Sequence, residues 1–217
     1  MDFNLTSSQQ MYVDTVRRFV RYGIIPEVME LEKNHTFPWQ IIQKAWNLGI
    51  LNLSIPESVK GFEVDPVSTA LIIKELSYGD TGISTSAMCN DLANIVIAQH
   101  GTDEQKTLFL GPFVENPVMA SFCLTEPGAG SDNSAMTTYI KKSPDGTYVL
   151  NGSKCFITNA SYASQFTVFC KVGKPTGNFM ACLIVPALPV LPSNSDPHLA
   201  LGKEITLPTG GKSRIGT

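Results

Sequence analysis

The hydrophobic periodicity of this chain changes once along its length, and that change limits the fold more than any other feature. From Thr6 to Phe113, apolar residues recur at the 3.6-residue spacing of amphipathic helices. From Val118 onward, they follow the alternating, β-branched patterns of strands. Asn116-Pro117 lies between the two patterns. The sequence therefore predicts an α+β chain, with an all-α helical bundle over 1–116 and a β-domain after it.

Capping residues mark the helix ends in the first half. Thr6 with Gln9 predicts a capping box. Asp65 precedes a proline suited to the first helical turn, and Gly49 ends an earlier helix. Thr102 and the two acids after it predict a further helix start. Five or six helices with short connections are expected, with their apolar faces forming the core.

The second half predicts short strands separated by turns, forming a partial antiparallel β-sandwich or barrel over 117–186. Asn151-Gly152 is typical of a tight hairpin turn. The region 187–217 is rich in proline and glycine and is expected to be an irregular tail. The expected strands are Ser121–Thr125, Met136–Lys141, Tyr148–Leu150, Lys154–Ile157, Gln165–Val172 and Asn178–Val185.

Composition excludes several classes of function. The 217 residues carry a formal net charge of −3, which removes the electrostatic basis for nucleic-acid binding. No apolar run approaches the ~20 residues that a transmembrane helix needs. The N-terminus has the pattern of neither a secretory signal nor a transit peptide. Five cysteines without a CxxC pair, and three scattered histidines, predict reduced thiols and no metal site.

The segment FCLTEPGAGSD, which begins at Phe122, is the richest in chemistry. Its two glycines, among them Gly130, permit tight turns and close approach of a ligand. Backbone N–H groups in such a loop, with the Ser131 hydroxyl, can line a site for a phosphate, and Thr125 adds a hydroxyl at the strand end. The alternative is an ordinary polar turn capped by Asp132. The GxGxxG fingerprint is incomplete and no βαβ pattern surrounds it, so a nicotinamide Rossmann fold is a poor fit.

A second segment, NGSKCFITN, runs from Asn151 to Asn159. The expected hairpin places Phe156 and Thr158 on one face of a strand and Ile157 on the other. An aromatic ring beside a hydroxyl suits a flat heteroaromatic ligand. A cross-strand pair in the core is the alternative interpretation.

Together the two segments resemble the acyl-CoA dehydrogenase family. CLTEPGAGSD is similar to that family's signature, and NGSKCFITN to its second flavin motif, with Phe156 in place of the usual tryptophan and thus without an indole N–H. Lys60 stands where the family commonly has the first of two glycines. The resemblance covers roughly Ser7 to Pro186 and is strongest to straight-chain members such as the medium-chain enzyme. Further similarity lies at Ile25-Pro26, Ala45-Trp46, Leu48-Gly49, Ile55-Pro56-Glu57, Glu75-Leu76-Ser77 and 101–106.

The resemblance implies an FAD site and names its residues. The Thr125 hydroxyl would bond the pyrimidine edge of the flavin, and Thr158 would lie near its N5 edge. Ser131 would reach the pyrophosphate and border the acyl-CoA channel, which makes it the one substrate-binding residue named. The implied cofactor-binding residues are Phe122, Cys123, Leu124, Thr125, Gly130, Ser131, Phe156, Ile157 and Thr158.

The implied reaction is α,β-dehydrogenation of fatty acyl-CoA thioesters in β-oxidation, with electrons passed to an electron-transfer flavoprotein. Members form homo-oligomers, mostly through a third, helical domain that also supplies the catalytic glutamate. They reside in the mitochondrial matrix of eukaryotes or the bacterial cytoplasm, and no targeting sequence is recognisable here.

The third domain is not recognisable after Pro186, so a truncated form is expected. We therefore predict no catalytic residue, assign Glu126 a structural role, and expect the chain alone to hold FAD weakly and to be inactive. One alternative is a non-catalytic remnant or a fragment that binds acyl-CoA or FAD. Among enzymes, the alternative is an acyl-CoA oxidase.

Overall fold

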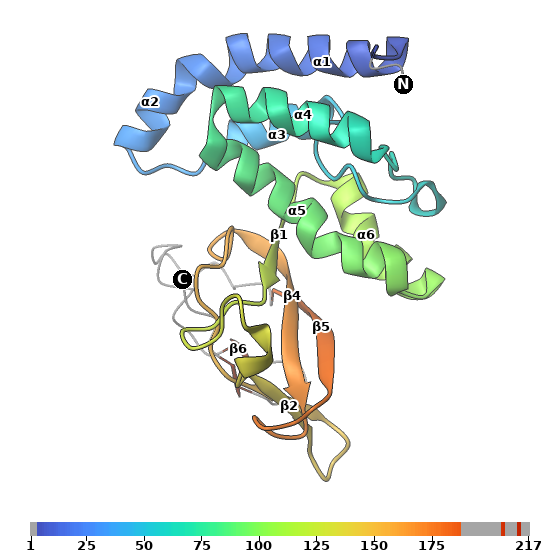
Figure 1. The fold of residues 1–217 in the computed structure, drawn as a ribbon, viewed down its shortest axis with the longest axis vertical. Coiled ribbons are helices and arrows are strands. Elements are labelled where there is room, and N and C mark those ends of the chain that lie inside the picture. The colour runs from blue at the N-terminus through green and yellow to red at the C-terminus, as the bar shows by residue number, and fades with distance from the viewer. Residues whose placement is uncertain (1–3, 188–204, 207–211, 214–217) are drawn as a thin grey trace. The chain divides into compact units, whose positions relative to one another are not determined.

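Residues 4–187, 205–206 and 212–213 are described by the structure, a computed structural model in which the chain divides into two units (Figure 1). The first unit is Met1–Pro117 and the second is Val118–Thr217. Helices make up the regular structure of the first, and the described strands all lie in the second. The predicted α+β class, with helices first and a sheet after them, is confirmed.

Among its described residues, the first unit has six α-helices and two short helical turns, η1 being π-helical and η2 a 3-10 turn. The predicted capping boxes at Thr6 and Thr102 are both present. The Asp65 side chain caps α4 by accepting hydrogen bonds from the next turn. In chain order the elements are α1 (Ser7–Phe19), η1 (Val20–Ile24), α2 (Ile25–Lys33), α3 (Trp39–Asn47), η2 (Glu57–Val59), α4 (Pro66–Gly79), α5 (Thr81–His100) and α6 (Asp103–Glu115).

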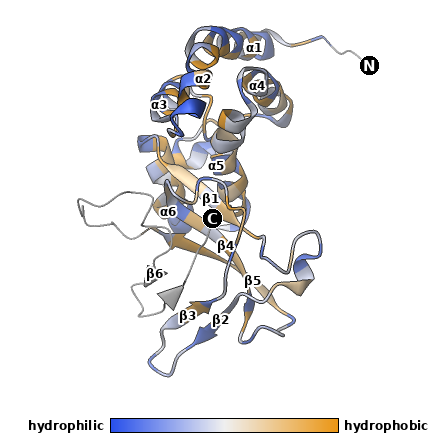
Figure 2. Cartoon of the chain, turned by 90° about the vertical axis from the view of Figure 1, so that its left-hand side faces the viewer, coloured by the Kyte–Doolittle hydropathy of each residue, from blue (hydrophilic) through white to orange (hydrophobic). Residues whose placement is uncertain are grey.

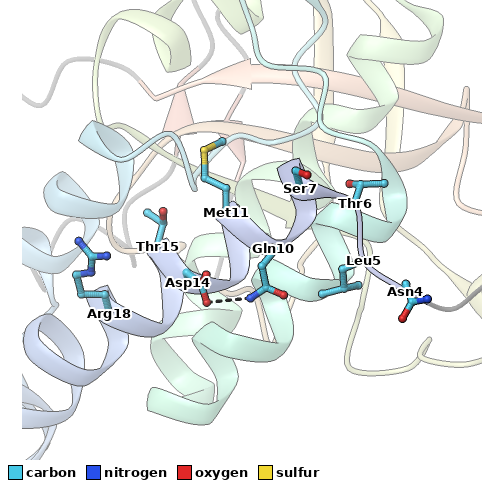
Figure 3. A pocket seen from close by; sticks show the side chains of 9 residues that line it. All are labelled: Asn4, Leu5, Thr6, Ser7, Gln10, Met11, Asp14, Thr15 and Arg18. Carbon is cyan, nitrogen blue, oxygen red and sulfur yellow. Dashed lines mark hydrogen bonds between the residues drawn. The ribbon is translucent and has the colours of Figure 1, made fainter.

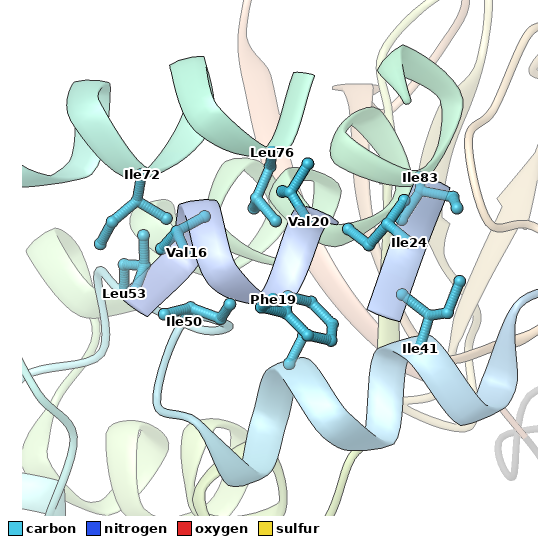
Figure 4. Close-up of a cluster of buried hydrophobic side chains, with 11 residues drawn as sticks. Val16, Phe19, Val20, Ile24, Ile41, Ile50, Leu53, Ile72, Leu76 and Ile83 are labelled. Atoms are coloured by element: carbon cyan, nitrogen blue, oxygen red, sulfur yellow. The ribbon is translucent and has the colours of Figure 1, made fainter. Parts of the chain in front are cut away.

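The core of the helical unit forms around one face of α1 and η1. Figure 4 shows Phe19 directed toward α3, and Val20 directed toward Leu76 on α4. Each fully buried aliphatic or aromatic side chain of this kind stabilises the fold by about 1.5–3 kcal/mol. The buried cluster consists of Val16, Phe19, Val20, Ile24, Ile41, Ala45, Ile50, Leu53, Ile72, Leu76 and Ile83.

The second unit is built around the long strand β4. The main sheet has the order β1-β4-β2-β3, and β5 also pairs with β4. A short 3-10 turn, η3 (Asn133–Ala135), precedes β2. Figure 2 shows hydrophilic colours at the tip of the β2–β3 hairpin, where the sequence is KKSPDGT. The strands are β1 (Met119–Cys123), β2 (Tyr139–Lys142), β3 (Tyr148–Asn151), β4 (Ala163–Val172), β5 (Met180–Pro186), β6 (Ile205–Thr206) and β7 (Lys212–Ser213).

The sheet is mixed, which corrects the expectation of an antiparallel one. β4 runs parallel to β1 and to β2, and antiparallel to β5. Alternating hydrophobicity is the same for both strand directions, so the pattern could not separate them. Of the tail predicted over 187–217, only Ala187 and the antiparallel pair β6–β7 lie within the described residues.

The hairpin and strand predicted around Asn151-Gly152 are wrong. The hairpin joins β2 to β3 instead, and its turn is closed by a hydrogen bond from Ser143 N to the Thr147 carbonyl at 2.8 Å. After β3 the chain leaves the sheet at Gly152, and 154–157 is not a strand. Gly152 has φ +147°, a conformation that favours glycine. Gly152 therefore lies in the segment that leaves β3, and the Asn151-Gly152 pair does not form the tight turn of a hairpin.

Candidate functional site

The segment FCLTEPGAGSD, called here the first motif, forms a tight loop at the carboxyl end of β1. The segment NGSKCFITN is the second motif. Glu126 and Ala129 exchange two backbone hydrogen bonds, at 2.9 and 3.1 Å, so the chain reverses over four residues. A Cβ atom added at Gly128 or at Gly130 would meet no other atom within 4 Å. The outer side of the loop is thus open rather than packed against the described protein.

The structure brings the second motif beside the first. Cys155 N donates to the Thr125 carbonyl at 3.0 Å. The Ser121 hydroxyl donates to the Thr158 carbonyl at 2.8 Å, and the Asn159 amide nitrogen to the Ala120 carbonyl at 3.3 Å. Three hydrogen bonds, between residues 30 to 39 positions apart, therefore hold the two segments side by side in the sheet unit.

A buried ion pair connects the same two segments. Lys154 Nζ lies 2.8 Å from Glu126 Oε1 and donates a second hydrogen bond, also 2.8 Å, to the Leu124 carbonyl. The other carboxylate oxygen accepts hydrogen bonds from the Thr137 backbone N–H and hydroxyl, at 2.7 and 2.9 Å. Thr138 N–H donates to Oε1 at 3.0 Å. Both side chains are thus desolvated and hydrogen-bonded.

This environment sets the charge of Glu126. Burial on its own raises the pKa of the carboxyl, but the hydrogen bonds from Lys154, Thr137 and Thr138 outweigh it and lower the pKa to about 2. The group is therefore a fixed carboxylate that holds no proton at neutral pH. A side chain bonded on both oxygens and buried within the unit joins parts of the protein, as expected for a structural residue.

The remaining predicted residues of the first motif divide between core and surface. The Cys123 side chain is fully buried in the sheet core, which leaves only its backbone for a ligand. Phe122 is half-buried and packs against Phe169, with ring centroids 5.0 Å apart. Leu124 and Thr125 are half-buried, whereas Gly130 and Ser131 are exposed.

In the second motif the side chains lie differently from the expectation. Phe156 is 88% exposed and has φ +56°, and Ile157 is buried in the sheet core. Thr158 is half-buried. Phe156 and Thr158 therefore do not share the face of a strand, because the segment after β3 is irregular, with a bend at Phe156 and a turn that begins at Thr158. The expected aromatic surface is present as the exposed ring of Phe156, whose backbone has a left-handed conformation.

Sequence reasoning gave no role to Lys154. The signal was present, since the second motif contains a single charged residue, Lys154, and the first contains two acids, Glu126 and Asp132, among mostly small or apolar neighbours. Two opposite charges in segments expected to lie together predict a pair. The bond to the Leu124 carbonyl could not have been found from the sequence.

The residues of this face fit a flavin nucleotide by their chemistry. Thr125 offers a hydroxyl at a half-buried position, and Ser131 offers one at an exposed position. Gly128 and Gly130 leave room for a ligand to approach the backbone closely. Phe156 offers an exposed ring. Backbone donors with hydroxyls suit phosphate oxygens, and a ring with nearby donors suits a flat heterocycle.

The helical unit has hollows of its own. An open one of about 910 Å³ follows the N-terminal part of α1, where Gln10 donates to Asp14 at 2.9 Å (Figure 3). Others of about 390 and 290 Å³ lie between α2 and α3 and beside Trp46.

The described residues include no group of three or more His, Cys, Asp or Glu side chains that could hold a metal ion. Among those same residues no helix is long and apolar enough to cross a membrane.

The structure is thus a helical unit followed by a mixed sheet, with a glycine loop at the end of the first strand. The family model for the acyl-CoA dehydrogenase N-terminal domain matches residues 6–116, and that for the middle domain matches 121–202. The chain belongs to the acyl-CoA dehydrogenase family. The resemblance seen in the two motifs is thereby confirmed.

Individual relatives agree with this assignment. The probable medium-chain specific acyl-CoA dehydrogenase 2, mitochondrial, of Caenorhabditis briggsae is 35% identical over 79% of this chain and 42% of its own length. The butyryl-CoA dehydrogenase structure from Megasphaera elsdenii has a TM-score of 0.78 and 36% identity, covering 86% of this chain and 50% of that one. An acyl-CoA dehydrogenase from Bacillus anthracis, complexed with FAD, has a TM-score of 0.77 and 31% identity over 84% and 32% of the two chains. The chain spans half or less of the length of these relatives.

Proposed function

We propose that this chain forms the flavin-facing part of an FAD-dependent acyl-CoA dehydrogenase that oxidises fatty acyl-CoA thioesters in β-oxidation. The observation that carries the proposal is the joining of the two motifs, in which Cys155 N–H is bonded to the Thr125 carbonyl beside an open glycine loop. The relatives support it, since one of them is complexed with FAD and another is a butyryl-CoA dehydrogenase.

Each residue of this face has a distinct task in the proposal. FAD, when bound, supplies the acceptor for a hydride from the acyl chain. Thr125 donates to the edge of the heterocycle, and Ser131 with the Gly130 backbone holds phosphate oxygens and borders the acyl-CoA. Phe156 covers one side of the ring with apolar surface. Phe122, Cys123, Leu124, Ile157 and Thr158 shape the surface mainly through their backbone.

The proposal extends to organisation and partners. We assign 1–116 to an N-terminal helical domain and 117–186 to a flavin-facing middle domain. The electron acceptor is an electron-transfer flavoprotein, and the compartment is the mitochondrial matrix or the bacterial cytoplasm, according to the source. Glu126 is not the base that removes the α-proton, because its carboxylate is fully engaged inside the sheet unit.

The test is a titration of the purified chain with FAD, followed by flavin fluorescence and the visible spectrum. Because the chain spans half or less of its relatives, we expect weak but saturable binding. Ser131→Ala and Thr125→Val should each weaken it several-fold. Ser143→Ala, which removes a hydroxyl from the β2–β3 turn, is the matched control and should leave binding unchanged. An unperturbed flavin spectrum at every protein concentration would reject the proposal.

A non-catalytic role in binding FAD or acyl-CoA is the second candidate. It is favoured by the two carboxylates of the motif, both of which are engaged: Glu126 with Lys154, and Asp132 with the Ser134 backbone N–H at 3.1 Å. Addition of butyryl-CoA to the FAD-loaded chain separates the candidates. Bleaching of the flavin band supports dehydrogenation, whereas stable colour supports binding alone. Rapid reoxidation by oxygen after bleaching would indicate an oxidase.

A further inference from the structure

We infer that Lys154 is a positioning residue that strengthens the Thr125 backbone N–H as a hydrogen-bond donor toward the flavin, by holding the Leu124 carbonyl of the same peptide group. The inference rests on the proposed function, because it needs a flavin at the Thr125 edge. It assigns to a buried lysine a task beyond joining two segments.

The geometry places the ammonium group on one specific peptide. The Leu124 carbonyl and the Thr125 N–H belong to the same amide, and Lys154 Nζ lies 2.8 Å from that carbonyl oxygen. The next residue, Cys155, donates its N–H to the Thr125 carbonyl at 3.0 Å. Two consecutive residues therefore hold Thr125 from both of its peptide groups. Its backbone cannot rotate without breaking one of these bonds.

The positive charge of Lys154 also polarises the Leu124–Thr125 peptide to which it donates. An amide whose oxygen accepts a hydrogen bond from a cation has more double-bond character in C–N, and its N–H becomes a stronger donor. The Lys154 side chain is only 2% exposed, so water screens this effect little. A stronger donor beside the flavin pyrimidine edge stabilises the reduced, anionic ring more than the oxidised ring.

Glu126 keeps this arrangement neutral and fixed. Its Oε1 accepts from Lys154 at 2.8 Å and from Thr138 N–H at 3.0 Å, so the ammonium is held between this carboxylate and the Leu124 carbonyl. The two charges cancel at a distance, whereas the dipole that they form acts on the adjacent Leu124 peptide. The bond to the Leu124 carbonyl also satisfies the buried ammonium, so the inference needs a measurement at Thr125 itself, which a purely structural pair would leave unchanged.

The test compares two double variants of the full chain. Lys154→Met with Glu126→Gln removes both buried charges and keeps one carbonyl acceptor, which can serve the Thr137 N–H and hydroxyl. Arg17→Met with Glu75→Gln removes the ion pair of the helical unit and is the matched control. The first measurement, without FAD, is the chemical shift of the Thr125 amide proton by NMR. The second is the reduction potential of bound FAD.

In the Lys154 double variant we expect the Thr125 amide proton to move upfield. We expect the ratio of reduced to oxidised flavin at a given potential to fall by about tenfold, which is about 30 mV for a two-electron couple. The control should change neither. An unchanged Thr125 resonance in the folded Lys154 variant overturns the inference, and so does an unchanged potential. If no variant binds FAD, the proposed function fails, and the amide shift alone decides whether Lys154 polarises this peptide.

Discussion

The two units each hold a buried glutamate against a basic side chain, and they do so in different ways. In the helical unit, Arg17 binds Glu75 in a bidentate fashion, at 2.8 and 3.1 Å, but the arginine side chain is 52% exposed. In the sheet unit, Lys154 and Glu126 are 2% and 3% exposed. The first pair lies at the edge of a core, and the second lies inside one.

This difference shows what each pair contributes. An ion pair with one partner open to water is screened and typically adds about 1 kcal/mol or less. A pair inside the protein loses its hydration, so it is tolerated only when further hydrogen bonds satisfy both groups. Thr137, Thr138 and the Leu124 carbonyl supply those bonds. The buried pair thus fixes positions at the candidate flavin face, while the open pair only joins two helices.

Removal of the lysine alone should have the largest effect. Lys154→Met leaves the Glu126 carboxylate buried without its cation, which costs about 3–5 kcal/mol of unfolding free energy. Hydrogen exchange of β4 measures the sheet unit separately, because both tryptophans, Trp39 and Trp46, report on the helical unit. Adding Glu126→Gln should recover most of the loss. Unchanged β4 protection in the single variant would show that the pair is dispensable.

Acidification should remove the stability that the charge of Glu126 gives to the Lys154–Glu126 pair. Hydrogen bonds lower the pKa of Glu126 from 4.5 to about 2 in the folded state. The stability from its charge is complete above about pH 4.5 and is lost as the pH falls toward 2. We expect the advantage of the unmutated chain over Glu126→Gln to shrink across that window, as measured by thermal unfolding. A constant difference between pH 6 and pH 2.5 would contradict the role given to the charge.

Two glycines of the sheet unit should respond unequally to alanine. Gly152 has φ +147°, and an added Cβ would lie 2.6 Å from Thr138 Cα. Gly152→Ala should therefore destabilise the sheet unit by about 1–3 kcal/mol. Gly128→Ala, where the added atom meets nothing within 4 Å, is the control and should leave stability nearly unchanged. Chemical denaturation followed by circular dichroism compares them, and equal losses would contradict the close packing at Gly152.

The open pair of the helical unit should give the smallest effect. Removal of Arg17 leaves little packing defect, because its side chain is 52% exposed, and Lys74 Nζ remains 3.7 Å from Glu75 Oε1. The pKa of the Glu75 carboxyl, which Arg17 lowers, then returns toward its ordinary value. Arg17→Met should shift the unfolding followed by tryptophan fluorescence only slightly, and less at high salt. If Arg17→Met lowered the free energy of unfolding as much as Lys154→Met, the contrast between the open and the buried pair would be wrong.

Much of the helical unit could be predicted from sequence because its signals are local. A capping residue and the side chain three positions later meet within one turn, as at Thr6 and Thr102. The sheet could not be predicted as well. The parallel pairing of β1 with β4 joins residues more than forty positions apart, and the residues between them carry no signal of direction.

The sequence by itself determined the order of helices and strands and the two motifs that place this chain in the acyl-CoA dehydrogenase family. Periodicity and short-range capping depend on neighbours along the chain, so they can be read from it. Only the tertiary structure decided that Cys123 and Ile157 turn into the core, that Phe156 turns outward, and that Lys154 reaches the Leu124 carbonyl. These outcomes depend on strand direction and on the desolvation of charges, which arise when distant segments pack together.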